Sequence, residues 1–466
     1  MTERLLFAKN GSPIVLCGGT ALHSRYDPQA EAERYVSALS LDKSLTAFIL
    51  VENALAYLAD ALKKKFPRSR VISLHSSAFY SQGGAEKASR LGPAAVWTPG
   101  KGIALDDFLE EILDGTAFEQ IKLIEWRPGV NAYGEKSVRL LSGTLEILQR
   151  LHANEVTKKA FSLRWFRNFL RSLNLLGGAV SVQKGNCPAV MCASGPSLEE
   201  ALPLILQKRK GLFVAAVSSS VPALLKHGVA PDLVAATDGG AWALRHLYES
   251  CRAFYDKNIV YAAALSAALP SQLDGKMILP ICDGSLYQQL VLRALPVPSL
   301  TFPQRGMVGA AALDLVMALT SGPVYTAGLD FEHRDLYTHA RPYAFEPLID
   351  ENANRFFPFY TRVFEREAAI RTGNANRVYK SWFKSHRARY GERLFTLSGG
   401  KDLTLPKGRM EQTPVFTRSG TSMAKNAGES AKVILKNALK DSRLKRQLED
   451  ELGEALAILE NEPVNE

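Results

Sequence analysis

The sequence predicts an α/β protein with a central Rossmann-like parallel sheet, a smaller N-terminal α/β domain and a mainly helical C-terminal region. Three observations predict it. Short apolar runs alternate with helix-like segments, the runs are apolar throughout, and glycine or small polar residues follow them. Such strands are typical of a parallel sheet that helices cover on both faces. A chain of 466 residues is also too long for one ordinary core, so we expect several domains.

The N-terminal α/β domain is predicted over residues 1–130. Asp27 is the expected cap of a first helix, and Pro28 is its expected first residue. Three further segments form a strand–helix–strand unit, at 45–51, 54–66 and 70–76.

A helical connector is predicted over residues 131–186. Within it Phe161, Trp165 and Phe169 recur every four residues, beside a stripe of arginines. We interpret this pattern as a helix with an aromatic face in the core and a basic face in solvent. A helix that binds a membrane surface or an acceptor is the alternative. Residues 177–186 are expected to form a linker into the next domain.

The central domain is predicted over residues 187–350, and the helical C-terminal region over residues 351–466. Strands are expected in the central domain at 189–193, 211–217, 232–238, 258–265, 276–281 and 323–330. The C-terminal region carries an apolar leucine stripe made of Leu444, Leu448, Leu452, Leu456 and Leu459. That stripe is either core or an interface, so the oligomeric state stays open.

Small and polar residues follow four of the predicted strands. They are Ser194-Gly195-Pro196-Ser197, Ser218-Ser219-Ser220, Thr237-Asp238-Gly239-Gly240 and Gly328-Leu329-Asp330. Ligands of open parallel sheets bind beyond the carboxyl ends of the strands, so these turns predict a ligand site. Ser197 and Glu200 match a capping box, and a helix N-terminus suits a phosphate. Neither a Walker motif nor a strict G-x-G-x-x-G follows a strand, which disfavours Walker-type and NAD sites.

Several side chains near these turns could carry chemistry. Asp238 and Asp330 could each bind a metal or a ribose, act as a base, or simply cap a loop. His339 is a candidate general base, because its ordinary pKa lies near neutrality, and His333 could act in its place.

Composition excludes several classes of protein. The net charge of +10 is spread along the chain without a nucleic-acid-binding motif, so we expect a basic soluble enzyme and no nucleic acid partner. The five cysteines are scattered without a C-x-x-C pair, which predicts neither a disulfide framework nor a zinc site and fits a cytoplasmic setting. We expect no signal peptide and no transmembrane anchor, because no apolar run of about 18 residues occurs.

Three stretches resemble the motility accessory factor (Maf) proteins and the MptE-like domain that they contain. They are "CASGPSLEEALPLI", "SSSVPALLKHGVAPDLVAATDGG" and "TAGLDFEHRDLYTHARP". The resemblance implies a sialyltransferase-like glycosyltransferase that moves a nonulosonic acid, of pseudaminic or legionaminic type, from a CMP-activated donor to Ser or Thr of flagellin. This activity would support motility, and it would require no cofactor. The N-terminal domain would then be structural or would recognise the acceptor.

The resemblance also implies roles for individual residues. Ser194, Gly195, Pro196 and Ser197 would form the nucleotide-binding turn, with Ser218, Ser219 and Asp238 lining the same pocket. Asp330 and His339 would be catalytic and face the sugar or the acceptor. Two alternatives remain. MptE enzymes are 6-hydroxymethyl-7,8-dihydropterin diphosphokinases, which use ATP and Mg²⁺, and Asp238 or Asp330 would then hold the metal. The other alternative is a nucleotide-binding flagellin accessory protein without catalysis.

Overall fold

The computed structural model describes residues 2–81, 95–113, 116–253, 259–303, 305–331 and 338–358, and further 360–361, 380, 383, 387–397, 412–419 and 426–460. The chain divides into two compact units, Met1–Lys158 and Lys159–Glu466. The division falls inside one long helix, α6 (Glu135–Leu173). The helices of the described residues include none that is long and apolar enough to cross a membrane.

The N-terminal unit is built on a parallel sheet in the order β6-β5-β4-β7. Its strands are β4 (Ala47–Val51), β5 (Arg70–Leu74), β6 (Val96–Trp97) and β7 (Ile121–Glu125). A small antiparallel sheet precedes it, made of β1 (Glu3–Phe7), β2 (Pro13–Cys17) and β3 (Thr20–Ala21). The helices are α1 (Pro28–Ala38), α2 (Tyr57–Lys65), α4 (Leu105–Ile112) and α5 (Arg127–Tyr133). The strand–helix–strand prediction is therefore confirmed, since β4, α2 and β5 follow in that order.

The start of α1 forms as its sequence predicts. Asp27 has extended backbone angles, and its side chain accepts a hydrogen bond from the backbone N–H of Ala30. Pro28 is the first helical residue. At this position a backbone N–H would have no partner within the helix, so proline loses no hydrogen bond there.

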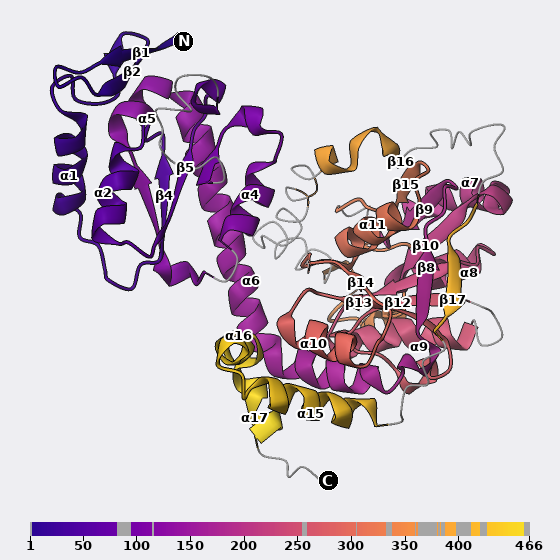
Figure 1. Ribbon diagram of the computed structural model, residues 1–466. Helices are drawn as coiled ribbons and strands as arrows, with labels where there is room; N and C mark the ends of the chain where they lie inside the picture. The colour runs from indigo at the N-terminus through magenta and orange to yellow at the C-terminus, as the bar shows by residue number, and fades with distance from the viewer. Residues whose placement is uncertain are drawn as a thin grey trace. The chain divides into compact units, whose positions relative to one another are not determined.

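The second unit contains an eight-stranded parallel sheet in the order β14-β13-β12-β11-β10-β9-β15-β16 (Figure 1). Every neighbouring pair in it is parallel. The strands are β9 (Ala189–Cys192), β10 (Phe213–Val217), β11 (Leu233–Ala236), β12 (Val260–Ala264), β13 (Met277–Cys282), β14 (Leu300–Thr301), β15 (Val324–Ala327) and β16 (Leu394–Thr396). The central strands are buried along their whole length, as their uniformly apolar sequences predict.

Helices cover both faces of this sheet (Figure 1). One core joins the sheet to the C-terminal half of α6 and to α7 (Leu198–Gln207), α8 (Val221–Lys226), α9 (Leu244–Ala253), α10 (Leu286–Ala294), α15 (Ala427–Ala438) and α16 (Ser442–Leu452). The other core lies under α11 (Val308–Leu319) and includes Tyr390. The described residues also contain α12 (Glu346–Glu351) and α17 (Leu456–Glu460).

The order of the strands creates a switch point beside β9. From β9 the chain adds β10 to β14 in one direction, and then returns through α11 to place β15 on the other side of β9. The helix α7, which follows β9, and the helix α11, which leads into β15, belong to cores on opposite faces of the sheet. A ligand crevice is expected at such a point in an open α/β sheet.

Two sequence predictions are corrected here. Residues 177–186 are not a plain linker, because β8 (Val180–Gln183) lies within them and pairs antiparallel with β17 (Val415–Arg418). In α6 the core face is formed mainly by Phe166 and Phe169, which are fully buried, whereas Phe161 is exposed. The partner strand β17 lies more than 200 residues along the chain from β8, so local sequence carries no sign of the pairing.

The C-terminal leucine stripe belongs to the core of the second unit. Leu448, Leu452 and Leu459 are fully buried, and Leu444 and Leu456 pack against the same cluster. Of the two interpretations of the stripe, core or interface, this burial supports the core for these residues.

Candidate functional site

The predicted strand-end turns meet at the switch point of the large sheet. β9 pairs with both β10 and β15 in parallel register, so the turns that follow these strands lie at one edge. The turn after β11 is next along that edge, because β11 pairs with β10.

Two glycines allow the turns after β9 and β15 to touch. The N–H of Gly195 donates to the carbonyl oxygen of Gly328 at 2.7 Å. A Cβ on Gly195 would lie 2.5 Å from Oδ2 of Asp330 and 2.6 Å from that same carbonyl oxygen. Gly328 has a φ of +71°, and a Cβ there would lie 2.4 Å from the carbonyl oxygen of Ala193. Both positions therefore require glycine.

Ser197 and Asp330 form the central polar contact. The backbone N–H of Ser197 donates to Oδ2 of Asp330 at 2.7 Å, and its hydroxyl donates to Oδ1. The capping-box prediction is wrong, because Ser197 has helical backbone angles and its side chain does not cap α7. The carboxylate of Asp330, from a loop far along the chain, accepts hydrogen bonds at the start of α7 instead. It lies at the positive end of the helix dipole, where a negative charge is stabilised.

The serines after β10 differ from one another. Ser220 is fully buried, and its hydroxyl contacts the carbonyl oxygens of Cys192 and Val217 at 2.9 Å each. Ser218 is buried and Ser219 is half-buried. Ser220 thus fastens the start of α8 to β9, which leaves Ser218 and Ser219 as the candidate ligand contacts.

Asp238 follows β11 and is exposed. Its Oδ1 accepts the N–H of Gly240 at 2.7 Å, so the side chain shapes its own turn. The turn packs against α6. A Cβ on Gly239 would lie 2.6 Å from the indole of Trp165, and the side-chain amide of Asn168 donates to the carbonyl oxygen of Gly239 at 3.0 Å. Trp165 thus supports the candidate site.

His339 lies in a segment that crosses this edge of the sheet. The N–H of Ala340 donates to the carbonyl oxygen of Ser194 at 2.8 Å, and the N–H of Arg341 donates to Oε1 of Glu199 at 2.7 Å. Nδ1 of His339 is 2.7 Å from the hydroxyl of Thr338. Its ring stacks on Tyr343 with a centroid distance of 4.0 Å and an interplanar angle of 7°. The imidazole is therefore held beside the turn after β9. His333 lies outside the described residues.

Sequence reasoning missed an aromatic group around His246. Its members are Trp242, His246, Tyr343 and Phe345, and the guanidinium of Arg245 lies 5.6 Å from the Phe345 ring centre. Burial lowers the pKa of His246 to about 4, against a weaker opposing effect of Asp238. The stretch "AWALRHLY" directly after the Asp238 turn was the available signal.

The described residues do not offer a ready-made metal site. Nowhere in the described ranges do three or more His, Cys, Asp or Glu side chains gather where they could hold an ion. Of the two aspartates that were candidates, Asp330 gives both oxygens to Ser197 and Asp238 gives one to Gly240.

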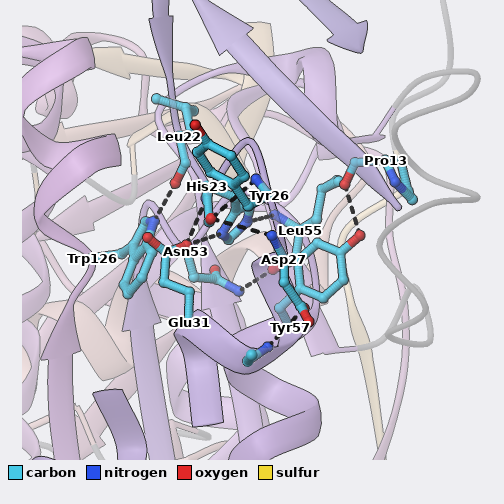
Figure 2. A network of polar contacts seen from close by, with 12 residues as sticks. Pro13, Leu22, His23, Tyr26, Asp27, Glu31, Asn53, Leu55, Tyr57 and Trp126 are labelled. Carbon is cyan, nitrogen blue, oxygen red and sulfur yellow. Dashed lines mark hydrogen bonds and ion pairs between the residues drawn. The ribbon is translucent and has the colours of Figure 1, made fainter. Parts of the chain in front are cut away.

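The N-terminal unit has a separate buried network centred on His23 (Figure 2). Nε2 of His23 accepts the N–H of Leu55 at 3.2 Å, and Nδ1 lies 3.8 Å from Oε2 of Glu31. The indole N–H of Trp126 donates to the carbonyl oxygen of Leu22 at 2.7 Å. Burial lowers the pKa of His23, which favours the neutral ring that can accept from Leu55. These contacts tie the ends of β3, β4 and β7 together.

Parts of this chain are similar to known proteins. Residues 165–335 match the family model described as 6-hydroxymethylpterin diphosphokinase MptE-like. A protein of Treponema pallidum (strain Nichols), described as "Uncharacterized protein", is 26% identical over 330 residues, which are 69% of this chain and 66% of that protein. The structure of a Maf glycosyltransferase from Magnetospirillum magneticum AMB-1 is similar with a TM-score of 0.44 and 12% identity, over 72% of this chain and 60% of that one.

The matched part of this chain thus spans just under two thirds of the Treponema protein and three fifths of the Magnetospirillum protein. The family match begins in α6 and includes all strands from β8 to β15 together with the turns at Gly195, Ser218, Asp238 and Asp330. Residues 165–335, which contain the switch point of the sheet, therefore match an MptE-like domain.

Proposed function

We propose that this protein is a sialyltransferase-like glycosyltransferase that moves a nonulosonic acid, of pseudaminic or legionaminic type, from a CMP-activated donor to Ser or Thr of flagellin. The observation that carries the proposal is the meeting of the Gly195 turn, the Asp330 turn and the His339 segment at the switch point of an MptE-like domain. The Maf-like motifs of the sequence are its second support.

The donor would lie along the carboxyl edge of the strands. Ser197 already bonds to Asp330, so in this proposal both residues hold the turn in shape. The hydroxyls of Ser194, Ser218 and Ser219 then meet the phosphate, and the exposed carboxylate of Asp238 meets the ribose hydroxyls. Asp330 is in this reading a positioning residue.

The reaction would be a single displacement. The acceptor hydroxyl oxygen forms a bond to the anomeric carbon while the bond from that carbon to the CMP phosphate oxygen breaks, and CMP leaves with the electron pair. His339 takes the hydroxyl proton. When the Thr338 hydroxyl accepts from Nδ1–H of His339, the acceptor nitrogen of the neutral ring is Nε2, which would take the proton. Stacking on Tyr343 keeps the ring in position.

The test is a calorimetric titration of the full chain with CMP, CDP, ATP and a pterin, each with and without Mg²⁺. We expect CMP to bind without metal. Ser219→Tyr should abolish this binding by filling the crevice, whereas Ser37→Tyr, on an exposed face of α1, should leave it intact. CMP-sugar transfer to flagellin should then be lost in His339→Ala.

The family description favours one second candidate, a 6-hydroxymethylpterin diphosphokinase. Binding of ATP and pterin that depends on Mg²⁺, without affinity for CMP, would establish that activity instead. CMP binding with no transfer in any condition would point to a flagellin accessory protein.

A further inference from the structure

We propose that Trp242, Phe345 and His246 form a subsite for the planar heterocycle of a nucleotide, with an aromatic surface for stacking and a ring nitrogen for the edge of the base. The inference deepens the proposed function and rests on its nucleotide donor. It concerns the part of the site that follows β11, two strands away from the turn after β9.

The surface on which a heterocycle would stack is the exposed indole ring of Trp242. Trp242 is 72% exposed, although its neighbour Ala243 is buried. Its ring centre lies 6.1 Å from that of Phe345, which in turn lies 5.5 Å from Tyr343. The guanidinium of Arg245 lies over Phe345, and its Nε donates to the carbonyl oxygen of Ala344 at 2.7 Å. An exposed indole backed by fixed rings offers a heterocycle a large contact area at little entropic cost.

The hydrogen-bonding group is His246. The residue is 9% exposed, and its Nδ1 is fully buried without a hydrogen-bond partner in the structure. Its ring lies 5.0 Å from Phe345 and 5.4 Å from Tyr343, so it is enclosed by the same aromatic group. A buried polar atom without a partner costs free energy, and a bound ligand would recover it. Because burial keeps the ring neutral, it presents one donor and one acceptor, as base edges do.

The distance between the ends of β9 and β11 would let one nucleotide contact both the serine turns and the aromatic group around His246. Adjacent strands lie about 4.8 Å apart, so the ends of β9 and β11 are separated by about 10 Å. The segment from Ala340 to Phe345 bridges this interval, since it bonds to Ser194 at one end and contacts Trp242 at the other. A phosphate at the serines and a base at Trp242 would therefore place the ribose near Asp238, which lies at the turn between them.

The experiment compares a ligand with a base and one without. CMP and ribose 5-phosphate are titrated into the full-length wild-type chain and into Trp242→Ala, by calorimetry and by quenching of tryptophan fluorescence. We expect Trp242→Ala to weaken CMP about 5- to 100-fold, the loss of one stacked base, and to leave ribose 5-phosphate unchanged. Tyr248→Ala removes an exposed aromatic side chain of α9, the helix that follows Trp242, and is the matched control.

His246→Phe keeps the aromatic packing and removes the ring nitrogens. It should weaken CMP, and it should also change the preference between cytidine and uridine, which a purely structural residue would not do. ATP and a pterin are titrated alongside. If ATP or the pterin bound in a way that depends on Trp242 while CMP did not bind, the result would support the subsite and refute the proposed CMP-linked donor.

Three results would overturn the inference. One is equal CMP affinity in wild type and Trp242→Ala. Another is equal weakening of CMP and ribose 5-phosphate by that variant, which would mean that Trp242 does not contact the base. The third is that none of the heterocyclic ligands binds, which would leave the exposed ring to an acceptor sugar or protein.

Discussion

Replacing Asp330 tests whether its carboxylate holds the Gly195 turn together. Asp330→Ala removes the acceptor of the Ser197 N–H, at 2.7 Å, and of the Ser197 hydroxyl. Ser197 is only 8% exposed, so its amide would be left buried without a partner. Hydrogen bonds to a charged group contribute about 1.5–3 kcal/mol, and an unpaired buried donor costs about 1–3 kcal/mol. Since the hydroxyl can turn elsewhere, we expect a loss of about 2–3 kcal/mol in the stability of the second unit.

The assay combines thermal unfolding with hydrogen exchange at the Ser197 amide. A loss of this size corresponds to a melting temperature lower by about 4–10 °C, with faster exchange of that amide. Asp330→Asn should cost less than half as much, because its oxygen can accept from the Ser197 N–H while its NH₂ donates to the hydroxyl. Asp450→Ala, on the exposed face of α16, is the control.

The reasoning would be refuted if Asp330→Ala melted like the Asp450→Ala control with unchanged exchange at Ser197. Equal damage from Asp330→Asn and Asp330→Ala would show that charge, and not hydrogen-bond geometry, maintains the turn.

Three further predictions concern the same unit. Gly195→Ala places a methyl carbon 2.5 Å from a carboxylate oxygen, so it should lower the urea midpoint by the equivalent of about 1–3 kcal/mol; Gly177→Ala, with nothing within 4 Å, should not. Arg305→Ala leaves the buried Asp314 carboxylate without its 2.7 Å ion pair, so unfolding should become easier by about 3–5 kcal/mol. On folding, burial lowers the pKa of His246 from 6.5 to about 4. Its contribution of about 3 kcal/mol is complete above pH 6.5 and is lost as pH falls toward 4, so His246→Phe should flatten the melting temperature measured from pH 7 to 4.

Each of these predictions has a contrary result. Equal midpoints for the two glycine variants would mean that the turns after β9 and β15 do not touch. A harmless Arg305→Ala would mean that Asp314 reaches solvent, although the Tyr390 hydroxyl also donates to it at 2.6 Å. An unchanged pH slope in His246→Phe would assign the acid sensitivity to other groups, such as His23, whose pKa burial also lowers.

The strands and their turns were predictable because their signals are local. A run such as the one that forms β10 is apolar at every position, which only a strand buried on both faces requires. Asp27 and Pro28 likewise mark the start of α1, since capping involves residues three apart. The cluster of Ser, Gly and Asp after β9, β10, β11 and β15 located the candidate site for the same reason.

The contacts inside that site were not predictable from local pattern. Ser197 and Glu200 form a good capping box as a sequence, yet the hydroxyl of Ser197 bonds to Asp330, 133 residues away. Trp165 was interpreted as a core residue of a helix, and its position beside Gly239 depends on how α6 packs against the sheet.

By itself, the sequence determined the strands β9 to β13 and β15 and the turns after them that carry polar side chains, because both follow from neighbouring residues. Only the tertiary structure decided the order of the strands, the pairing of β8 with β17, and the meeting of the Gly195 turn, Asp330 and the His339 segment at one edge. The physical reason is that these contacts join residues far apart in the chain. Their formation depends on the packing of whole helices against a shared sheet, and not on the propensities of the residues involved.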